Sequence, residues 1–103
     1  MTDEVIFQRN TIQLRRLRLA PGEAMLWHRD PFQRIAIVVS GDLLSIEYRD
    51  GGETLRVEIS PGMVDWEEPS KRVHRAINIG RTEYQQVTIF FLDSPDAVPQ
   101  PSE

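Results

Sequence analysis

The chain has 103 residues, a formal net charge of −4 and no cysteine. This length fits one domain with one hydrophobic core, and a nucleic-acid-binding domain would instead carry a basic patch. The lack of cysteine excludes disulfides, thiolate metal ligands and a cysteine nucleophile. Residues 1–10 show no signal-peptide pattern, and no apolar run approaches the roughly 20 residues of a spanning helix. We therefore expect a cytoplasmic protein that binds neither nucleic acid nor membrane.

Apolar residues recur with a period of two in the first half of the chain, which is typical of β-strands. After an N-terminal arm at residues 1–10, we expect a strand at 11–19, with a β-bulge or a bend near Arg15 and Arg16 where the alternation shifts. A short strand is expected at 24–29. Residues 35–39 form an apolar, largely β-branched run, which predicts a strand buried on both faces.

The second half continues the pattern around one clear hairpin signal. Asp50-Gly51-Gly52 separates the strands expected at 43–49 and 54–59, and glycine accepts the positive φ of such a turn without steric cost. Further strands are expected at 63–66, 73–79 and 84–92, which together favour an all-β sandwich or barrel over residues 11–92. Residues 93–103 hold three prolines and are expected to form a loose or surface-docked tail.

Two similar stretches hold both histidines of the chain. In the first, a Pro-Gly pair ending at Gly22 is followed by His28 and, further on, by Gly41. In the second, a Pro-Gly pair ending at Gly62 leads to His74. Pro69 lies inside the second stretch and Asn78 follows it.

These spacings resemble the two motifs of the cupin superfamily, and most closely its small single-domain bacterial members. The resemblance covers about residues 14–92 and implies an all-β double-stranded β-helix, a jelly-roll barrel. In the family, three histidines and a glutamate hold Fe, Mn, Ni or Zn inside the barrel. Here Asp30 stands at the position of the second histidine, Arg34 at that of the glutamate and Lys71 at that of a glycine.

Two interpretations of the candidate metal ligands stay open. In the first, His28, Asp30 and His74 form a 2-His-1-carboxylate triad for one divalent Fe, Mn, Ni or Zn ion. Residues 28 and 30 point to the same face of a strand, which favours this triad. In the second, no metal binds, because Arg34 pairs with Asp30 through charge-assisted hydrogen bonds.

Arg34 and the two histidines also form a candidate pocket for a small organic acid, since arginine recognises carboxylates bidentately. Trp27, Trp66 and Asn78 are further candidate ligand-binding residues. For the tryptophans the competing interpretation is a core or rim aromatic, and for Asn78 it is a local bond at a strand end. The acidic run Asp65, Glu67 and Glu68 is either a second ligand set or a solvated strand end.

Three kinds of function therefore stay open from the sequence. They are a metal-dependent enzyme acting on a small organic acid, a metal-free ligand-binding or sensing protein, and an accessory barrel without catalytic activity. We also expect a homodimer, formed by sheet packing or by exchange of an N-terminal strand around residues 5–7. An open sheet edge has unpaired backbone groups that a second copy can cover.

Overall fold

A computed structural model describes residues 1–94 of the chain. Within these residues the chain forms β-strands and no helix. This part of the chain therefore contains no helix long and apolar enough to cross a membrane. The strands are β1 (Thr2–Arg9), β2 (Ile12–Leu19), β3 (His28–Asp30), β4 (Arg34–Ser40), β5 (Leu43–Tyr48), β6 (Leu55–Glu58), β7 (Val64–Glu67), β8 (Ser70–Asn78) and β9 (Tyr84–Phe91). Most of the tail predicted at 93–103 lies outside the described residues.

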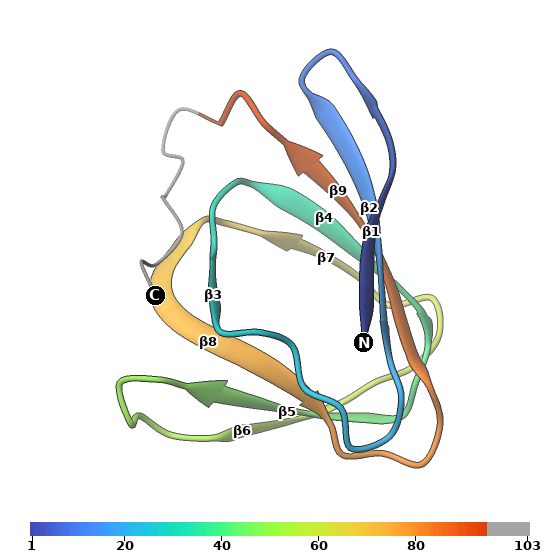
Figure 1. Ribbon diagram of the computed structural model, residues 1–103, viewed down its shortest axis with the longest axis vertical. Coiled ribbons are helices and arrows are strands. Elements are labelled where there is room, and N and C mark those ends of the chain that lie inside the picture. The colour runs from blue at the N-terminus through green and yellow to red at the C-terminus, as the bar shows by residue number, and fades with distance from the viewer. Residues whose placement is uncertain (95–103) are drawn as a thin grey trace.

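The strands pair antiparallel in two sheets. The five-stranded sheet has the order β1-β2-β9-β4-β7, and the four-stranded sheet has the order β3-β8-β5-β6. The two sheets lie on opposite sides of the interior, and the chain crosses between them repeatedly from β3 onward (Figure 1). The prediction of an all-β double-stranded β-helix is confirmed.

The first half of the chain differs from the predictions in three places. The segment expected as an arm forms the edge strand β1, which pairs with β2 from Thr2 to Arg9. The β-bulge expected near Arg15 and Arg16 is wrong, because β2 pairs without interruption with β9 and the register shift lies in β1 instead. The strand expected at 24–29 begins only at His28. Before it, Ala24 makes only an isolated bridge to Ile77.

Strand β4 is covered on one face and not on both, so that prediction is wrong. Arg34, Ala36 and Val38 point into the interior, and alternation sends Ile35, Ile37 and Val39 to the other face. Val39 is 48% exposed. Residues 1–94 place no third layer against this face of the sheet.

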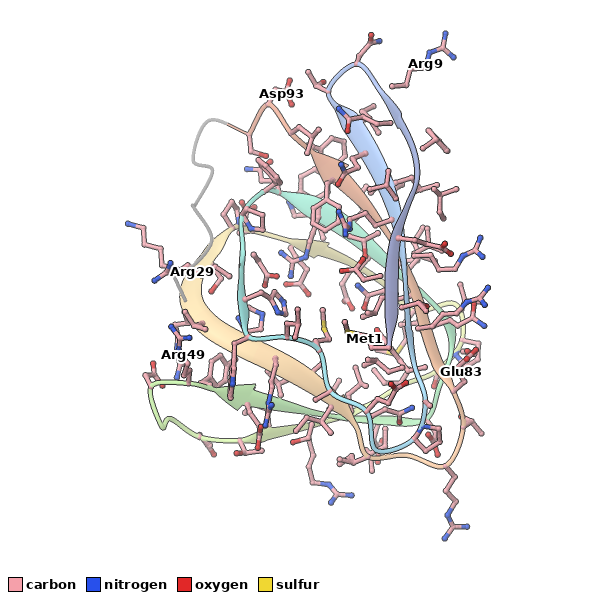
Figure 2. All side chains as sticks on the ribbon, in the orientation of Figure 1. Met1, Arg9, Arg29, Arg49, Glu83 and Asp93 are labelled. Atoms are coloured by element: carbon pink, nitrogen blue, oxygen red, sulfur yellow. The ribbon has the colours of Figure 1, made fainter. Side chains whose placement is uncertain are left out.

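The hydrophobic core lies between the two sheets, and Figure 2 shows side chains pointing into this space, while Arg9 extends outward from the end of β1. Its buried apolar members come from both sheets: Leu17, Leu19, Val38, Leu44, Ala76 and Tyr84. The hairpin predicted at Asp50-Gly51-Gly52 is confirmed between β5 and β6, with Gly51 at a φ of 82°.

We expect Gly41→Ala to lower the free energy of unfolding by about 2–4 kcal/mol. Gly41 has a φ of 129°, and an added Cβ would lie 2.8 Å from Cδ1 and 3.3 Å from Cα of the buried Tyr84. Urea denaturation measures the loss. Gly51→Ala is the matched control, because its φ is also positive but an added Cβ meets nothing within 4 Å. Equal losses in both variants would contradict a steric cost at Gly41.

Candidate metal centre and ligand cavity

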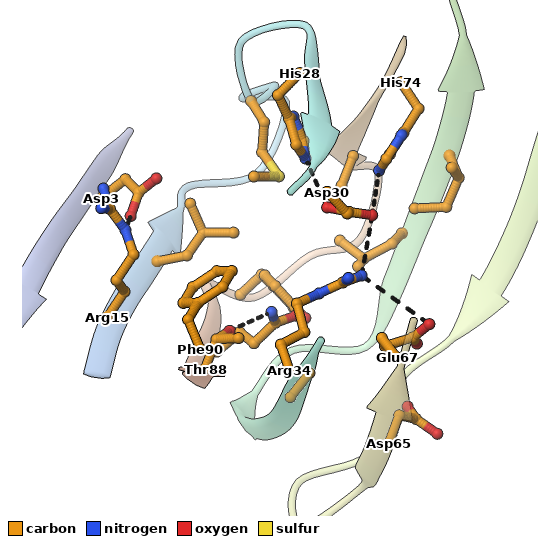
Figure 3. Close-up of a pocket in the computed structure, with 18 of the residues that line it drawn as sticks. Asp3, Arg15, His28, Asp30, Arg34, Asp65, Glu67, His74, Thr88 and Phe90 are labelled. Atoms are coloured by element: carbon orange, nitrogen blue, oxygen red, sulfur yellow. Dashed lines mark hydrogen bonds and ion pairs between the residues drawn. The ribbon is translucent and has the colours of Figure 1, made fainter. Parts of the chain in front are cut away.

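The space between the sheets contains a cavity of about 630 Å³. Most of its wall is apolar and comes from both sheets, including Leu17 and Val38 of the five-stranded sheet and Leu44, Ile46 and Val57 of the four-stranded sheet. Polar side chains gather at one end, where Figure 3 shows His28, Asp30 and His74 pointing toward one another and Arg34 approaching from below. The cavity therefore has a polar end and an apolar body.

Two adjacent strands of the four-stranded sheet supply the polar end. His28 and Asp30 are alternate residues of β3, so their side chains leave the same face. His28 lies directly opposite His74 of β8 in the strand register, and the two imidazole centroids are 4.6 Å apart. The facing pair is thus a consequence of strand alternation and register.

Both imidazoles are oriented by backbone carbonyls. Nδ1 of His28 lies 2.8 Å from the Leu26 carbonyl oxygen, and Nδ1 of His74 lies 2.8 Å from the Arg72 carbonyl oxygen. A carbonyl oxygen accepts hydrogen bonds only, so Nδ1 carries the proton in each ring and Nε2 of the neutral ring keeps a lone pair. Metal-ligating histidines are commonly held in this way.

Both Nε2 atoms face the carboxylate of Asp30. The Nε2 of His28 is 3.5 Å from Oδ1, the Nε2 of His74 is 3.0 Å from Oδ2, and one ligand atom from each residue lies within 4.8 Å of the others. Neutral Nε2 and carboxylate oxygen are both acceptors, so their contact is favourable only with a cation between them. Either a proton or a metal ion meets this need, and two imidazoles with one carboxylate fit a divalent transition metal.

The charge of Asp30 is fixed by its surroundings. Burial opposes ionisation of this carboxyl group, but hydrogen bonds from His28 and His74 and the charge of Arg34 outweigh it. The pKa of Asp30 is therefore held far below its usual value. The site keeps an anionic ligand at any pH at which the protein would be used.

Arg34 occupies the position at which the family resemblance expects a glutamate. Its Nη2 donates to Oδ2 of Asp30 at 3.0 Å, and the two side chains are only 13% and 14% exposed. The carboxylate of Glu67 lies 4.0 Å from the same nitrogen, while Nη1 lies 3.5 Å from the Glu68 carbonyl oxygen. Arg34 thus meets Asp30 through one nitrogen and leaves part of its guanidinium directed elsewhere.

Metal-free protein is expected to lose stability as the pH rises above about 6.5. The hydrogen bond to Asp30, and then the bond to the Arg72 carbonyl, raise the pKa of His74 above its ordinary value of 6.5, against the effect of burial. A raised folded-state pKa stabilises fully below the unfolded pKa, and this contribution is lost as the pH passes the raised value. Thermal unfolding of chelator-treated protein measures it; His74→Gln should flatten the profile, and a flat wild-type profile would contradict it.

The other residues predicted to bind a ligand lie in different places. Trp27 borders the cavity, with the Arg75 guanidinium 4.4 Å above its ring centroid. Trp66 is 56% exposed and stacks on Phe91 at 5.5 Å, outside the cavity. Asn78 is fully buried, and its amide nitrogen donates to carbonyl oxygens outside the cavity. The structure brings Trp27 to the cavity and leaves Trp66 and Asn78 away from it.

Several polar cavity residues were not identified from the sequence. The hydroxyl of Tyr84 contacts Gln86, and Nε2 of Gln86 donates to Oγ1 of Thr88 at 2.8 Å. All three are inward residues of β9. Polar residues that alternate with Val87 and Ile89 were the available signal, because the periodicity of two assigns them to one face. The same rule places Glu67 in the cavity.

Comparisons with known proteins extend the description. No protein-family model matches the sequence, and no curated protein matches it significantly. A cupin domain from Bordetella pertussis Tohama I is similar in structure, with a TM-score of 0.76 and 20% identity over 86% of this chain and 90% of that one. An uncharacterised Klebsiella pneumoniae protein with a double-stranded β-helix domain gives a TM-score of 0.70 and 18% identity, over 99% and 84%.

An enzyme is also among the similar structures. An oxalate oxidase in complex with the substrate analogue glycolate gives a TM-score of 0.60 and 24% identity. The match covers 85% of this chain but only 45% of the oxidase chain. At these identities the likeness concerns the fold.

Proposed function

The chain has the cupin fold, and on this premise we propose that it is a small metal-dependent enzyme that acts on an organic acid. His28, Asp30 and His74 hold one divalent Fe, Mn, Ni or Zn ion in this proposal. The observation that carries it is the convergence of both Nε2 atoms on the Asp30 carboxylate while both Nδ1 atoms bond to carbonyl oxygens. Three protein ligands leave coordination positions open, as catalytic rather than structural metal sites do.

The organic acid is proposed to bind beside the metal ligands. A bound metal ion would act as a Lewis acid toward an oxygen of this substrate. Arg34 lines the cavity next to Asp30, where its guanidinium can pair with the substrate carboxylate. The similar oxalate oxidase structure contains glycolate, a small hydroxy acid, which supports the same chemical class.

The substrate is further proposed to carry an apolar body. The cavity volume of about 630 Å³ falls within the 300–1,000 Å³ typical of ligand pockets and far exceeds a two-carbon acid. Away from the metal end its wall is formed by side chains such as Leu44, Ile46 and Val57, against which apolar carbon atoms are favourably buried. An aliphatic or aromatic monocarboxylate fits both ends of the cavity.

Metal titration tests the first part of the proposal. Chelator-treated protein, without an affinity tag of histidines, is expected to bind one equivalent of Zn(II), Mn(II) or Fe(II) by calorimetry. His74→Ala and Asp30→Asn each remove a ligand atom and should weaken binding by about 100-fold or more. Asp50→Asn is the matched control, because this carboxylate is exposed, pairs with the Arg72 guanidinium and does not line the cavity. Absence of saturable binding of all three metals would overturn the metal site.

A thermal-shift series tests the substrate class separately. Metal-loaded protein is compared in glycolate, hexanoate and phenylacetate, because a ligand that binds only the folded state raises the melting temperature. The two acids with apolar bodies are expected to give the larger shifts. A larger shift with glycolate would contradict the apolar body and leave the metal site standing.

A metal-free anion-binding protein is the second candidate function. The observation that favours it is the set of three nitrogen groups around Asp30, from His28, His74 and Arg34. When both imidazoles are protonated, this set carries more positive charge than Asp30 neutralises, and a carboxylate ligand is attracted. Equal shifts by the same acids with and without metal would support this candidate over the enzyme.

A further inference from the structure

The two walls of the cavity differ in polarity along its body. The four-stranded sheet contributes apolar strand residues to its wall: Leu44, Ile46, Val57 and Ala76. The five-stranded sheet lines the opposite wall and carries three polar residues at alternate positions of β9, which we call the polar row: Tyr84, Gln86 and Thr88. Neither the proposed metal site nor the proposed carboxylate site uses this row.

The polar row forms a hydrogen-bonded chain with a direction. Within residues 1–94, Gln86 is the only hydrogen-bond partner of the Tyr84 hydroxyl, which donates to its Oε1. The Nε2 of Gln86 in turn donates to Oγ1 of Thr88 at 2.8 Å. Burial, and then the charge of Asp65, raise the pKa of Tyr84, so the phenol keeps the proton that starts the chain. Thr88 is therefore the last member of the chain.

This chain leaves one donor and one acceptor unused. The Thr88 hydroxyl accepts from Gln86 but donates to no acceptor within residues 1–94, although Thr88 is only 5% exposed. The Oε1 of Gln86 accepts from Tyr84 and has a second lone pair, which no described residue uses. Buried polar groups are normally hydrogen-bonded. A hydroxyl group both accepts and donates, so a ligand hydroxyl beside Thr88 and Gln86 would complete the chain.

The charges around the polar row favour a neutral group over a second carboxylate. Arg15 of β2 lies directly opposite Thr88 in the strand register, but its Nε donates to the Asp3 carboxylate at 3.0 Å, as Figure 3 shows. The positive charge of Arg15 is therefore neutralised. Asp65 also lines the cavity, and its negative charge acts on Tyr84. A second carboxylate of a ligand would be repelled here, whereas a hydroxyl group would not.

The strand register sets the distance from this position to the carboxylate site. Arg34 of β4 pairs with Phe90 of β9, and Thr88 lies two residues from Phe90 on the same face of the sheet. Diagonal neighbours of this kind are about 7–8 Å apart. A ligand whose carboxylate pairs with Arg34 can therefore place the far side of a benzene ring beside Thr88, with the ring against the apolar wall.

We propose that Thr88 and Gln86 select a substrate with a hydroxyl group on its apolar body, such as an aromatic monocarboxylate with a para hydroxyl. The Thr88 hydroxyl donates to the substrate oxygen, and the substrate hydroxyl donates to Oε1 of Gln86, while Tyr84 holds the Gln86 amide in this orientation. This inference rests on the proposed function, because it takes the carboxylate site at Arg34 as given. Thr88 and Gln86 determine specificity and hold no metal.

Calorimetric titration of Zn(II)-loaded protein with two acids of the same shape tests the hydroxyl site. Para-hydroxyphenylacetate is expected to bind about tenfold more tightly than para-methylphenylacetate, because the methyl group leaves the donor of Thr88 and the acceptor of Gln86 unpaired. If the two acids bound equally, or the methyl acid bound more tightly, the hydroxyl site would be overturned and the proposed function would stand. Binding of neither acid would overturn both.

Variants of the polar row test which residues make this distinction. Thr88→Val keeps the side-chain shape and should abolish the preference for the hydroxy acid, and Gln86→Met, at a less buried position, should reduce it. Thr2→Val is the matched control, because Thr2 is an exposed strand residue that does not line the cavity. A distorted cavity would weaken both acids alike, so the ratio of the two affinities reports the hydroxyl contact. An unchanged ratio in Thr88→Val and Gln86→Met would overturn the proposal.

Discussion

Asn78→Asp is expected to lower the free energy of unfolding by about 4 kcal/mol or more, at neutral pH. The Asn78 side chain is fully buried. Its amide nitrogen donates to the carbonyl oxygens of Leu19 and Thr82, each at 2.9 Å, and Oδ1 accepts from the backbone nitrogen of Gly80 at 3.0 Å. Aspartate keeps the shape but places an anionic oxygen against two carbonyl oxygens.

The size of this loss follows from what Asn78 connects. Asn78 ends β8 in the four-stranded sheet, and Leu19 ends β2 in the five-stranded sheet, so the amide links the two sheets. Backbone bonds from Asn78 to Glu23 and from Gly22 to Asn78 reinforce the same point. Asn78→Ala should cost about 3 kcal/mol, since it removes the bonds without adding a charge.

Urea denaturation of the variants at two pH values measures both effects. Burial would raise the pKa of the new aspartate, so the Asn78→Asp loss should shrink as the pH falls and the carboxyl group gains its proton. The Asn78→Ala loss should not change in this way. Asn10→Asp is the matched control, because Asn10 is an exposed turn residue with a φ of 55°, a conformation that aspartate also accepts. Equal stability of the Asn10 and Asn78 variants would contradict the proposed linkage.

Local patterns in the sequence were sufficient for most of the strands, though not for β1 or the start of β3, and for the polar end of the cavity. The spacing of His28 and Asp30 by two residues specifies that they share a face, and this pair with His74 was predicted as the candidate ligand set. The register between these strands could not be predicted from the sequence. The direct pairing of His28 with His74 depends on how β3 aligns with β8, and more than 40 residues of chain separate the two histidines. Nothing local in either stretch encodes that alignment.

The outcomes for Trp66 and for β4 show what local patterns omit. Trp66 was proposed for the ligand site from its closeness to His74 in sequence, yet in β7 it lies between the inward residues Asp65 and Glu67 and points outward. The apolar run at 35–39 predicted burial on both faces, which requires a layer on each side. Residues 1–94 supply a layer on one side only, and the apolar character of a strand does not report whether a second layer exists.

Arg34→Gln is expected to raise the affinity for Zn(II) by about 100-fold when no organic acid is present. A guanidinium and a divalent ion about 5 Å apart repel by roughly 7 kcal/mol at an effective dielectric of 20. Asp30, which contacts Arg34 at 3.0 Å, and Glu67 at 4.0 Å compensate part of this repulsion. A net effect near 3 kcal/mol corresponds to the expected factor.

The organic acid is also coupled to the metal ion. A carboxylate placed between Arg34 and the metal ion is attracted to both, so phenylacetate should raise the Zn(II) affinity of the wild type, and by reciprocity Zn(II) should raise the phenylacetate affinity by the same factor. Arg34→Gln should keep this coupling, because the acid still contacts the metal ion, but it should weaken the binding of phenylacetate to the metal-free protein. Arg34→Glu supplies a further carboxylate and should bind Zn(II) more tightly than Arg34→Gln.

Calorimetric titration of chelator-treated protein with Zn(II), with and without phenylacetate, measures affinity and coupling together. Arg15→Gln is the matched control, because Arg15 also lines the cavity but pairs with Asp3 of the neighbouring strand β1 at 3.0 Å (Figure 3). Its loss should leave the metal affinity within about threefold of the wild type. If Arg34→Gln instead weakened Zn(II) binding, Arg34 would be a supporting partner that orients Asp30, and the predicted repulsion between Arg34 and the metal ion would be wrong.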